Sequence, residues 1–250
     1  MLLLRGRPFM GALFLLLALA AVYFQVRKPS STPFLRGQHL AQKQGCFACH
    51  GPGGVSGSPN PGAESDIPSW DGGSAMMYLE KEDHIREYIE LGHRKDKDPK
   101  QIAGLVRMPA YHGSFSQHEM DDLVAYVKGV SAFYPGMPDS ARIGMETAKK
   151  SGCLGCHGES GRGGIHNPGS FKGIIPGWDD PQLADLTRND AETEEWIRTG
   201  TLKRLGSNRI ARHFLHAQRL SMPAYDTLLT VQQIRDISRF INWLRSDREI

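Results

Sequence analysis

The stretch SGCLGCHGES, residues 151–160, contains two cysteines separated by two residues, with a histidine directly after the second. The same arrangement occurs in QGCFACHGPG, residues 44–53. The chain has four cysteines, so every thiol belongs to one of these two C-x-x-C-H motifs. The chemistry of the protein therefore depends on paired thiols beside an imidazole.

The two motifs are part of a longer duplication. Matching residues follow one another in the same order at offsets of 107 to 114 positions. Besides the motifs, they are Gly37 and Gly144, IPSWD (67–71) and IPGWD (175–179), Gly92 and Gly200, MPAY (108–111) and MPAY (222–225), and Tyr126 and Phe240. So many ordered matches indicate two homologous domains. The second copy is six residues longer, around IARHFLHAQ between Gly200 and Met222.

Each copy has the same predicted helical plan. An opening helix (34–46, 140–153) precedes the motif, and a long glycine-rich loop follows it. A middle helix (82–91, 191–199) ends at a glycine suited to a left-handed cap. The final helix has apolar residues spaced for one face and starts with a capping box, Ser116 with Glu119 and Thr230 with Gln233. Strand-like alternation is scarce, so we expect an all-α fold.

The sequence divides into four segments. Residues 1–28 form a membrane anchor or uncleaved signal, 34–133 form domain 1, and 141–248 form domain 2. Residues 134–140, YPGMPDS, are the predicted linker between the domains.

Residues 8–24, PFMGALFLLLALAAVYF, contain no charged residue and have basic residues on both sides. This pattern is typical of an export signal or of a single membrane anchor. Ala18-Leu19-Ala20 has small residues where a signal peptidase needs them, but the apolar run continues through Phe24. We therefore favour an uncleaved anchor, and expect both domains to lie outside the cytoplasm, in the periplasm.

The net charge of +3 belongs to the N-terminal segment, because residues 1–28 carry four basic and no acidic residues. The remainder has a net charge of −1, so it lacks the basic footprint of a nucleic-acid-binding protein. Residues 29–134 carry −3 and residues 135–250 carry +2.

Three chemistries use closely spaced thiols. A redox-active dithiol is normally found near a strand–helix–strand pattern, which is not evident here. A four-thiolate zinc site would require the two motifs to converge and would leave the histidines unexplained. Covalent haem attachment accounts for every residue and is favoured. Cys46, Cys49, Cys153 and Cys156 would form thioethers to two haem c groups, with His50 and His157 as iron ligands.

Met108 and Met222 are the candidates for the second axial ligand of each iron. They occupy matched positions shortly before the final helices, and each precedes a proline that keeps its backbone extended. Methionine–histidine ligation is an electron-transfer arrangement that raises the reduction potential. Five methionines without a matched partner are expected to be packing or surface residues: Met76, Met77, Met120, Met137 and Met145.

The motifs, the MPAY loops and the helical plan resemble the class I cytochromes c, specifically diheme cytochromes built from two fused domains. The resemblance covers about residues 34–248 and implies domains of a few helices wrapped around a covalently bound haem. It implies axial pairs His50/Met108 and His157/Met222. It also implies close crossing of the first and last helices at Gly37 and Gly144. Fifty-eight positions separate His50 from Met108 and 65 separate His157 from Met222, which leaves the loop conformation open.

Trp70 and Trp178 recur in the IPxWD segments. The resemblance implies that each indole contacts a haem propionate or the porphyrin edge, and ordinary packing of the ring is the alternative.

The function that these features indicate is electron transfer. We expect a non-enzymatic, membrane-tethered carrier on the periplasmic side of a bacterial inner membrane, passing single electrons between respiratory proteins. Six-coordinate iron has no vacant site for a substrate. A catalytic diheme cytochrome of the peroxidase or thiosulfate-oxidising type is one alternative. An electron-transfer subunit of a dehydrogenase or oxidase is the other.

Overall fold

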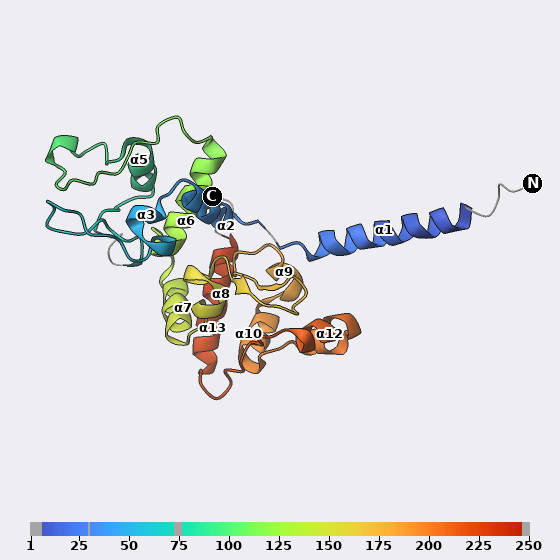
Figure 1. Cartoon of the computed structure of the whole chain (residues 1–250). Coiled ribbons are helices and arrows are strands. Elements are labelled where there is room, and N and C mark those ends of the chain that lie inside the picture. The colour runs from blue at the N-terminus through green and yellow to red at the C-terminus, as the bar shows by residue number, and fades with distance from the viewer. Residues whose placement is uncertain (1–6, 30, 73–76, 247–250) are drawn as a thin grey trace, which may run out of the picture.

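The computed structural model describes residues 7–29, 31–72 and 77–246. After α1 (Arg7–Arg27), domain 1 contains α2 (Pro33–Lys43), α3 (Phe47–His50), η1 (Pro52–Gly54), α5 (Asp83–Leu91), η2 (Pro99–Gln101) and α6 (Gln117–Ser131). Domain 2 contains α7 (Asp139–Lys150), α8 (Leu154–His157), η3 (Glu159–Gly161), β1 (Ile165–His166), β2 (Ile174–Ile175), α9 (Leu183–Leu186), α10 (Asp190–Thr199), α11 (Lys203–Ser207), α12 (Arg209–Ala217) and α13 (Val231–Ser246). The fold is mostly helical (Figure 1).

The predicted helices are present, with one difference in both domains. The opening helices α2 and α7 end at Lys43 and Lys150, before the cysteines rather than at them. Gly45 and Gly152 follow, each with φ of 77°, and this left-handed backbone cannot continue a helix. Each motif therefore forms a short helix of its own, α3 or α8.

The first and last helices of each domain cross at a glycine. α2 packs on α6 and α7 on α13. A side chain at Gly37 would collide with the Asp122 carbonyl oxygen and would come within 2.8 Å of the Tyr126 Cβ. At Gly144 it would collide with the Asp236 carbonyl. The close crossing expected at both glycines is confirmed.

Each domain has its own apolar core. In domain 1 the core includes Tyr126, which is 1% exposed, and in domain 2 it includes Phe240, which is 0% exposed. The half-buried side chains against the first core include Cys46, Trp70 and Met108. The second core itself contains Cys153 and Trp178, and Met222 packs against it. Each candidate site thus adjoins a separate core.

The two domains touch through the residues that follow η3. A side chain at Gly163 would come within 3.0 Å of the Phe34 ring of α2, and one at Gly129 of α6 would come within 3.2 Å of the Arg162 side chain. Arg162 Nε donates a hydrogen bond to the Tyr134 hydroxyl at 2.9 Å, and its guanidinium lies over the Tyr134 ring. The opening helix of domain 1 is therefore packed beside the residues that follow the motif of domain 2.

Domain 2 departs from domain 1 mainly in the segment before Met222. Its antiparallel hairpin β1–β2, in which Ile165 pairs with Ile175, has a smaller counterpart in domain 1, the isolated bridge between Ser58 and Ile67. The longer segment before Met222 folds into α11 and α12. Arg204 of α11 makes a bidentate ion pair with Glu192 of α10, at 2.7 and 2.9 Å, which attaches this addition to the middle helix.

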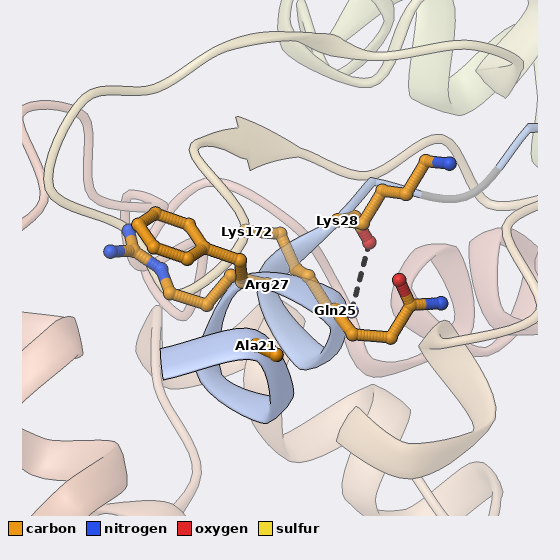
Figure 2. A pocket seen from close by; sticks show the side chains of 6 residues that line it. Ala21, Gln25, Arg27, Lys28 and Lys172 are labelled. Atoms are coloured by element: carbon orange, nitrogen blue, oxygen red, sulfur yellow. Dashed lines mark hydrogen bonds between the residues drawn. The ribbon is translucent and has the colours of Figure 1, made fainter. Parts of the chain in front are cut away.

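The end of α1 lies on domain 2, although domain 1 follows it in sequence. Arg27 Nε donates to the Phe171 carbonyl at 2.7 Å, and its guanidinium lies 5.5 Å from the centre of the Phe214 ring of α12. Figure 2 shows the shallow pocket that Arg27, Lys28 and Lys172 form there with Ala21, Phe24 and Gln25. α1 otherwise projects away from both domains (Figure 1).

Within the residues described above, no helix combines the length and the hydropathy needed to cross a membrane. Met1 to Gly6, which begin the predicted anchor or signal segment, lie outside the described residues, as do Asp247 and Arg248 at the predicted end of domain 2.

The helix crossing predicts a large loss of stability on a small substitution. We expect Gly144→Ala to lower the free energy of unfolding by at least about 2 kcal/mol, because the added methyl group meets backbone that cannot move aside. Gly206→Ala is the matched control, since nothing lies within 4 Å of a Cβ there. That control should be neutral or stabilising by up to about 1 kcal/mol in denaturant unfolding. Equal effects of both substitutions would contradict the role of the crossing.

Candidate haem-binding sites

The two C-x-x-C-H motifs have the same local geometry. The backbone N–H of His50 donates to the Cys46 carbonyl at 3.1 Å, and the backbone N–H of His157 donates to the Cys153 carbonyl at 3.1 Å. Each pair of cysteines and its histidine thus lie within about one helical turn. The four thiols are unpaired, and burial raises the pKa of Cys46 and Cys153.

The imidazole of each motif is oriented by a proline carbonyl. His50 Nδ1 lies 2.8 Å from the Pro68 carbonyl oxygen, and His157 Nδ1 lies 2.9 Å from the Pro176 carbonyl oxygen. A carbonyl only accepts, so Nδ1 carries the proton and Nε2 keeps its lone pair. Burial lowers the pKa of both histidines, which favours the neutral, ligating form.

Trp70 and Trp178 pack against these histidines. The ring centres of His50 and Trp70 are 4.6 Å apart, and those of His157 and Trp178 are 4.9 Å apart. Each tryptophan is also fixed by a backbone hydrogen bond. The Trp70 backbone N–H donates to the Gly54 carbonyl at 2.6 Å, and the Trp178 backbone N–H donates to the Gly161 carbonyl at 2.6 Å. The structure therefore brings both tryptophans into the candidate sites. A contact between their indoles and a haem remains a prediction.

The two methionine loops are attached to the middle helices. The carbonyl groups of Met108 and Met222 lie against Gly92 and Gly200, where a side chain would clash. Both glycines are left-handed C-caps, with φ of 77° and 73°. Three residues after each methionine, a tyrosine N–H donates to this helix end: Tyr111 to Ile89 at 3.0 Å and Tyr225 to Ile197 at 3.2 Å.

The unmatched methionines that the structure describes occupy packing or surface positions, as expected. Met120 is buried in the core of domain 1, and Met137 and Met145 pack against the core of domain 2. Met77 is 75% exposed, and Met76 lies outside the described residues.

One pair of matched segments was not identified from the sequence. Asn60-Pro61-Gly62 and Asn167-Pro168-Gly169 are identical triplets at the motif offset of 107. Both contact the segment just before the candidate methionine ligand. The roles of Pro68 and Pro176 were also missed, because a backbone acceptor leaves no signature in side-chain chemistry. A search of the duplication for every identical triplet would have found the asparagines.

Comparison with known proteins agrees with this arrangement. The family model described as cytochrome c matches residues 34–131 and again residues 141–245. The chain belongs to the cytochrome c family.

Two curated relatives are similar to part of this cytochrome. The cbb3-type cytochrome c oxidase subunit FixP of Azorhizobium caulinodans is 27% identical over 124 residues, 50% of this chain and 38% of the relative. Subunit CcoP of an Azospirillum species, strain B510, is 26% identical over 125 residues, 49% of this chain and 38% of the relative. The matched region is thus well under half of either relative.

Among solved structures, a reducing HAO-like protein complex from Kuenenia stuttgartiensis matches 87% of this chain and 97% of its own. Its sequence identity is 15% and its TM-score is 0.26.

The cytochrome carries two covalently bound haem c groups, one for each domain. The side chains present suit such a group: in each domain, two unpaired thiols on one turn precede an imidazole whose Nε2 is unprotonated. Haem iron supplies one-electron chemistry when bound. The cysteine pairs border separate cores, an arrangement that does not match a single four-thiolate zinc site.

Thioether attachment predicts how the haem content responds to substitution. We expect Cys153→Ala with Cys156→Ala to reduce the mass of the protein by about one haem, while the haem of domain 1 stays attached. Both wild-type haems should remain on the polypeptide in denaturing electrophoresis, visible by haem stain. Extraction of all haem from the wild type by acidic acetone would contradict covalent attachment through these residues.

Proposed function

We propose that this protein is a membrane-tethered, periplasmic diheme cytochrome c that passes single electrons between respiratory components. The observation that carries the proposal is the repeated ligand arrangement. In each domain a histidine oriented through Nδ1 and a methionine on an anchored loop are present at matched positions. With both axial positions supplied by protein, His50/Met108 and His157/Met222 leave the iron no open position for a substrate. We therefore propose a carrier and not an enzyme.

A second candidate is an electron-transfer subunit of an oxidase complex. It is favoured by the similarity to FixP and CcoP, which are named as subunits of cbb3-type cytochrome c oxidases. The match covers 38% of each, so the partner of this chain can differ from theirs. Copurification from detergent-solubilised membranes distinguishes a bound subunit from a free carrier.

A redox titration tests the carrier against a catalytic diheme enzyme. We expect two one-electron waves and the weak charge-transfer band of methionine-ligated ferric haem. Met108→Ala and Met222→Ala should each lower the potential of one wave, because a thioether ligand raises it, within the roughly 0.8 V that axial ligands control. The exposed Met77→Ala is the control and should change neither wave.

A high-spin ferric haem in the wild type that rapidly binds peroxide would instead support the enzyme. Unchanged spectra in both axial variants would rule out Met108 and Met222 as ligands.

Tethering is supported by the apolar run of residues 8–24, which lies within α1 and has basic residues on both sides. Covalently bound haem c behind a segment typical of export signals and anchors supports the periplasmic location. In this arrangement domain 2 is the domain held next to the end of the tether.

The tether predicts that the full chain stays in the membrane fraction during carbonate extraction, with an N-terminus at or near Met1. Replacing Leu15 and Leu16 with arginine should move it to the soluble fraction if it is exported at all, since a charge at the centre of a span costs about 2.5–3.5 kcal/mol. A mature protein that begins at Ala21 in the soluble periplasmic fraction would show a cleaved signal.

A further inference from the structure

The long loop after each motif histidine returns to the methionine loop through its Asn-Pro-Gly triplet. In domain 1, Asn60 Nδ2 donates to the Val106 carbonyl at 3.0 Å, and the Val106 N–H donates to Asn60 Oδ1 at 3.0 Å. The Leu105 N–H donates to the Pro61 carbonyl at 2.8 Å. The Asn60 amide and the Pro61 carbonyl are thus bonded to the backbone of Val106 and Leu105, two and three residues before Met108.

Domain 2 repeats the three bonds in the same register. Asn167 Nδ2 donates to the Leu220 carbonyl at 2.9 Å, and the Leu220 N–H donates to Asn167 Oδ1 at 3.0 Å. The Arg219 N–H donates to the Pro168 carbonyl at 3.0 Å. The bonded residues are again two and three positions before the methionine, here Met222. The three bonds keep the same positions relative to the methionine although the loop before Met222 is longer.

Each methionine is therefore held from both sides. On the N-terminal side, the asparagine amide pairs with the backbone as a neighbouring strand would, using both its donor and its acceptor. On the C-terminal side, the tyrosine N–H is fixed to the end of the middle helix. A proline directly follows each methionine and restricts the backbone between the two attachments. Few backbone torsions remain free.

We propose that Asn60 and Asn167 are positioning residues that hold Met108 and Met222 in place as axial ligands. The proposal rests on the ligand assignment of the proposed function. Without the amide, the segment before each methionine loses its attachment to the long loop, and the thioether samples more positions. The bond between methionine sulfur and iron then breaks more often.

The two asparagine clamps, Asn60 bonded to Val106 and Asn167 bonded to Leu220, differ in their exposure. Asn167 is 1% exposed, and its own backbone is fixed, since its N–H donates to the Gly173 carbonyl at 2.7 Å and its carbonyl accepts from the Ser170 hydroxyl at 2.9 Å. Asn60 is half-buried, and its two bonds to Val106 are exposed, whereas the bonds of Asn167 to Leu220 are partly buried. The partner residues themselves are similarly exposed, Val106 at 41% and Leu220 at 44%. Water can compete for the bonds of Asn60 far more readily than for those of Asn167.

The difference assigns the more displaceable ligand to domain 1. A small ligand of ferric haem, such as cyanide or imidazole, should replace the Met108 thioether before it replaces that of Met222. The iron–sulfur bond breaks and a bond from iron to the incoming ligand forms, without any change in the oxidation state of the iron.

The test uses the full-length ferric protein with both haems attached, and compares Asn60→Ala with Asn167→Ala. Asn208→Ala is the control, because Asn208 caps α12 through its side chain but does not bond the methionine loop. Asn60→Asp is the conservative variant, which keeps the acceptor for the Val106 N–H and loses the donor. Haem stain and circular dichroism verify that each variant retains its haems and helices. The readouts are the methionine–iron charge-transfer band and the rates of cyanide binding.

We expect two phases of cyanide binding in the wild type. Asn60→Ala should accelerate the fast phase at least about tenfold, and Asn167→Ala should accelerate the slow phase. In each variant the intensity of the charge-transfer band should fall by up to about half. Asn60→Asp should lie between wild type and Asn60→Ala, and Asn208→Ala should match the wild type.

A normal band with unchanged cyanide rates in both alanine variants would overturn the role of the asparagines and leave the electron carrier intact. Acceleration of the fast phase by Asn167→Ala would overturn the assignment to domain 1. Absence of the band from the wild type would overturn the ligand assignment and this proposal with it.

Discussion

In both domains the first and last helices cross so closely that a carbonyl group of one helix occupies the space of a side chain on the other. This crossing determines where the haem motif lies, because the motif follows the first helix within a few residues. It also brings the last helix's aromatic ring to the site: the Tyr126 hydroxyl donates to the Gly53 carbonyl at 2.9 Å, just after His50. Phe240 lies 5.8 Å from Trp178 in the second domain. The histidine, the tryptophan and the thiols all take their positions from this contact.

Three further attachments position the candidate ligands beside the crossing, and each uses backbone groups. Proline carbonyls orient the histidines, left-handed glycines receive the methionine carbonyls, and asparagine amides pair with the chain before the methionines. In domain 1 the side chains of the site are half-buried against the core, and in domain 2 Cys153 and Trp178 are part of the core itself. Apolar faces of a haem bound there add to the buried surface, so the cofactor contributes to the stability of the fold as well as to its chemistry.

The helices, their caps and the crossing glycines could be predicted because the duplication displays each of them twice. Ser116 with Glu119 forms the capping box that the spacing indicates, and Gly92 and Gly200 end the middle helices as expected. The predicted ends of α2 and α7 were wrong by about three residues, because the spacing of apolar residues does not reveal a glycine at positive φ. The β1–β2 hairpin and the asparagine clamps were not predicted. They depend on backbone groups brought together by the fold from distant parts of the sequence.

The differences between the domains lie in the loops and not in the helix crossings. The added α12 packs against the loop that contains Asn167: a side chain at Gly169 would clash with the Ala217 carbonyl of α12, and Phe171 packs on Phe214. The same elements receive Arg27 at the end of α1. In domain 1 the corresponding Asn60 is half-buried, while the segments before both methionines are exposed at Val106 and Leu220. The insertion of domain 2 thus helps to bury Asn167 and also contacts the end of α1. Duplication supplied two equivalent sets of candidate ligands, and divergence of the loops buried the asparagine beside one set more deeply than the asparagine beside the other.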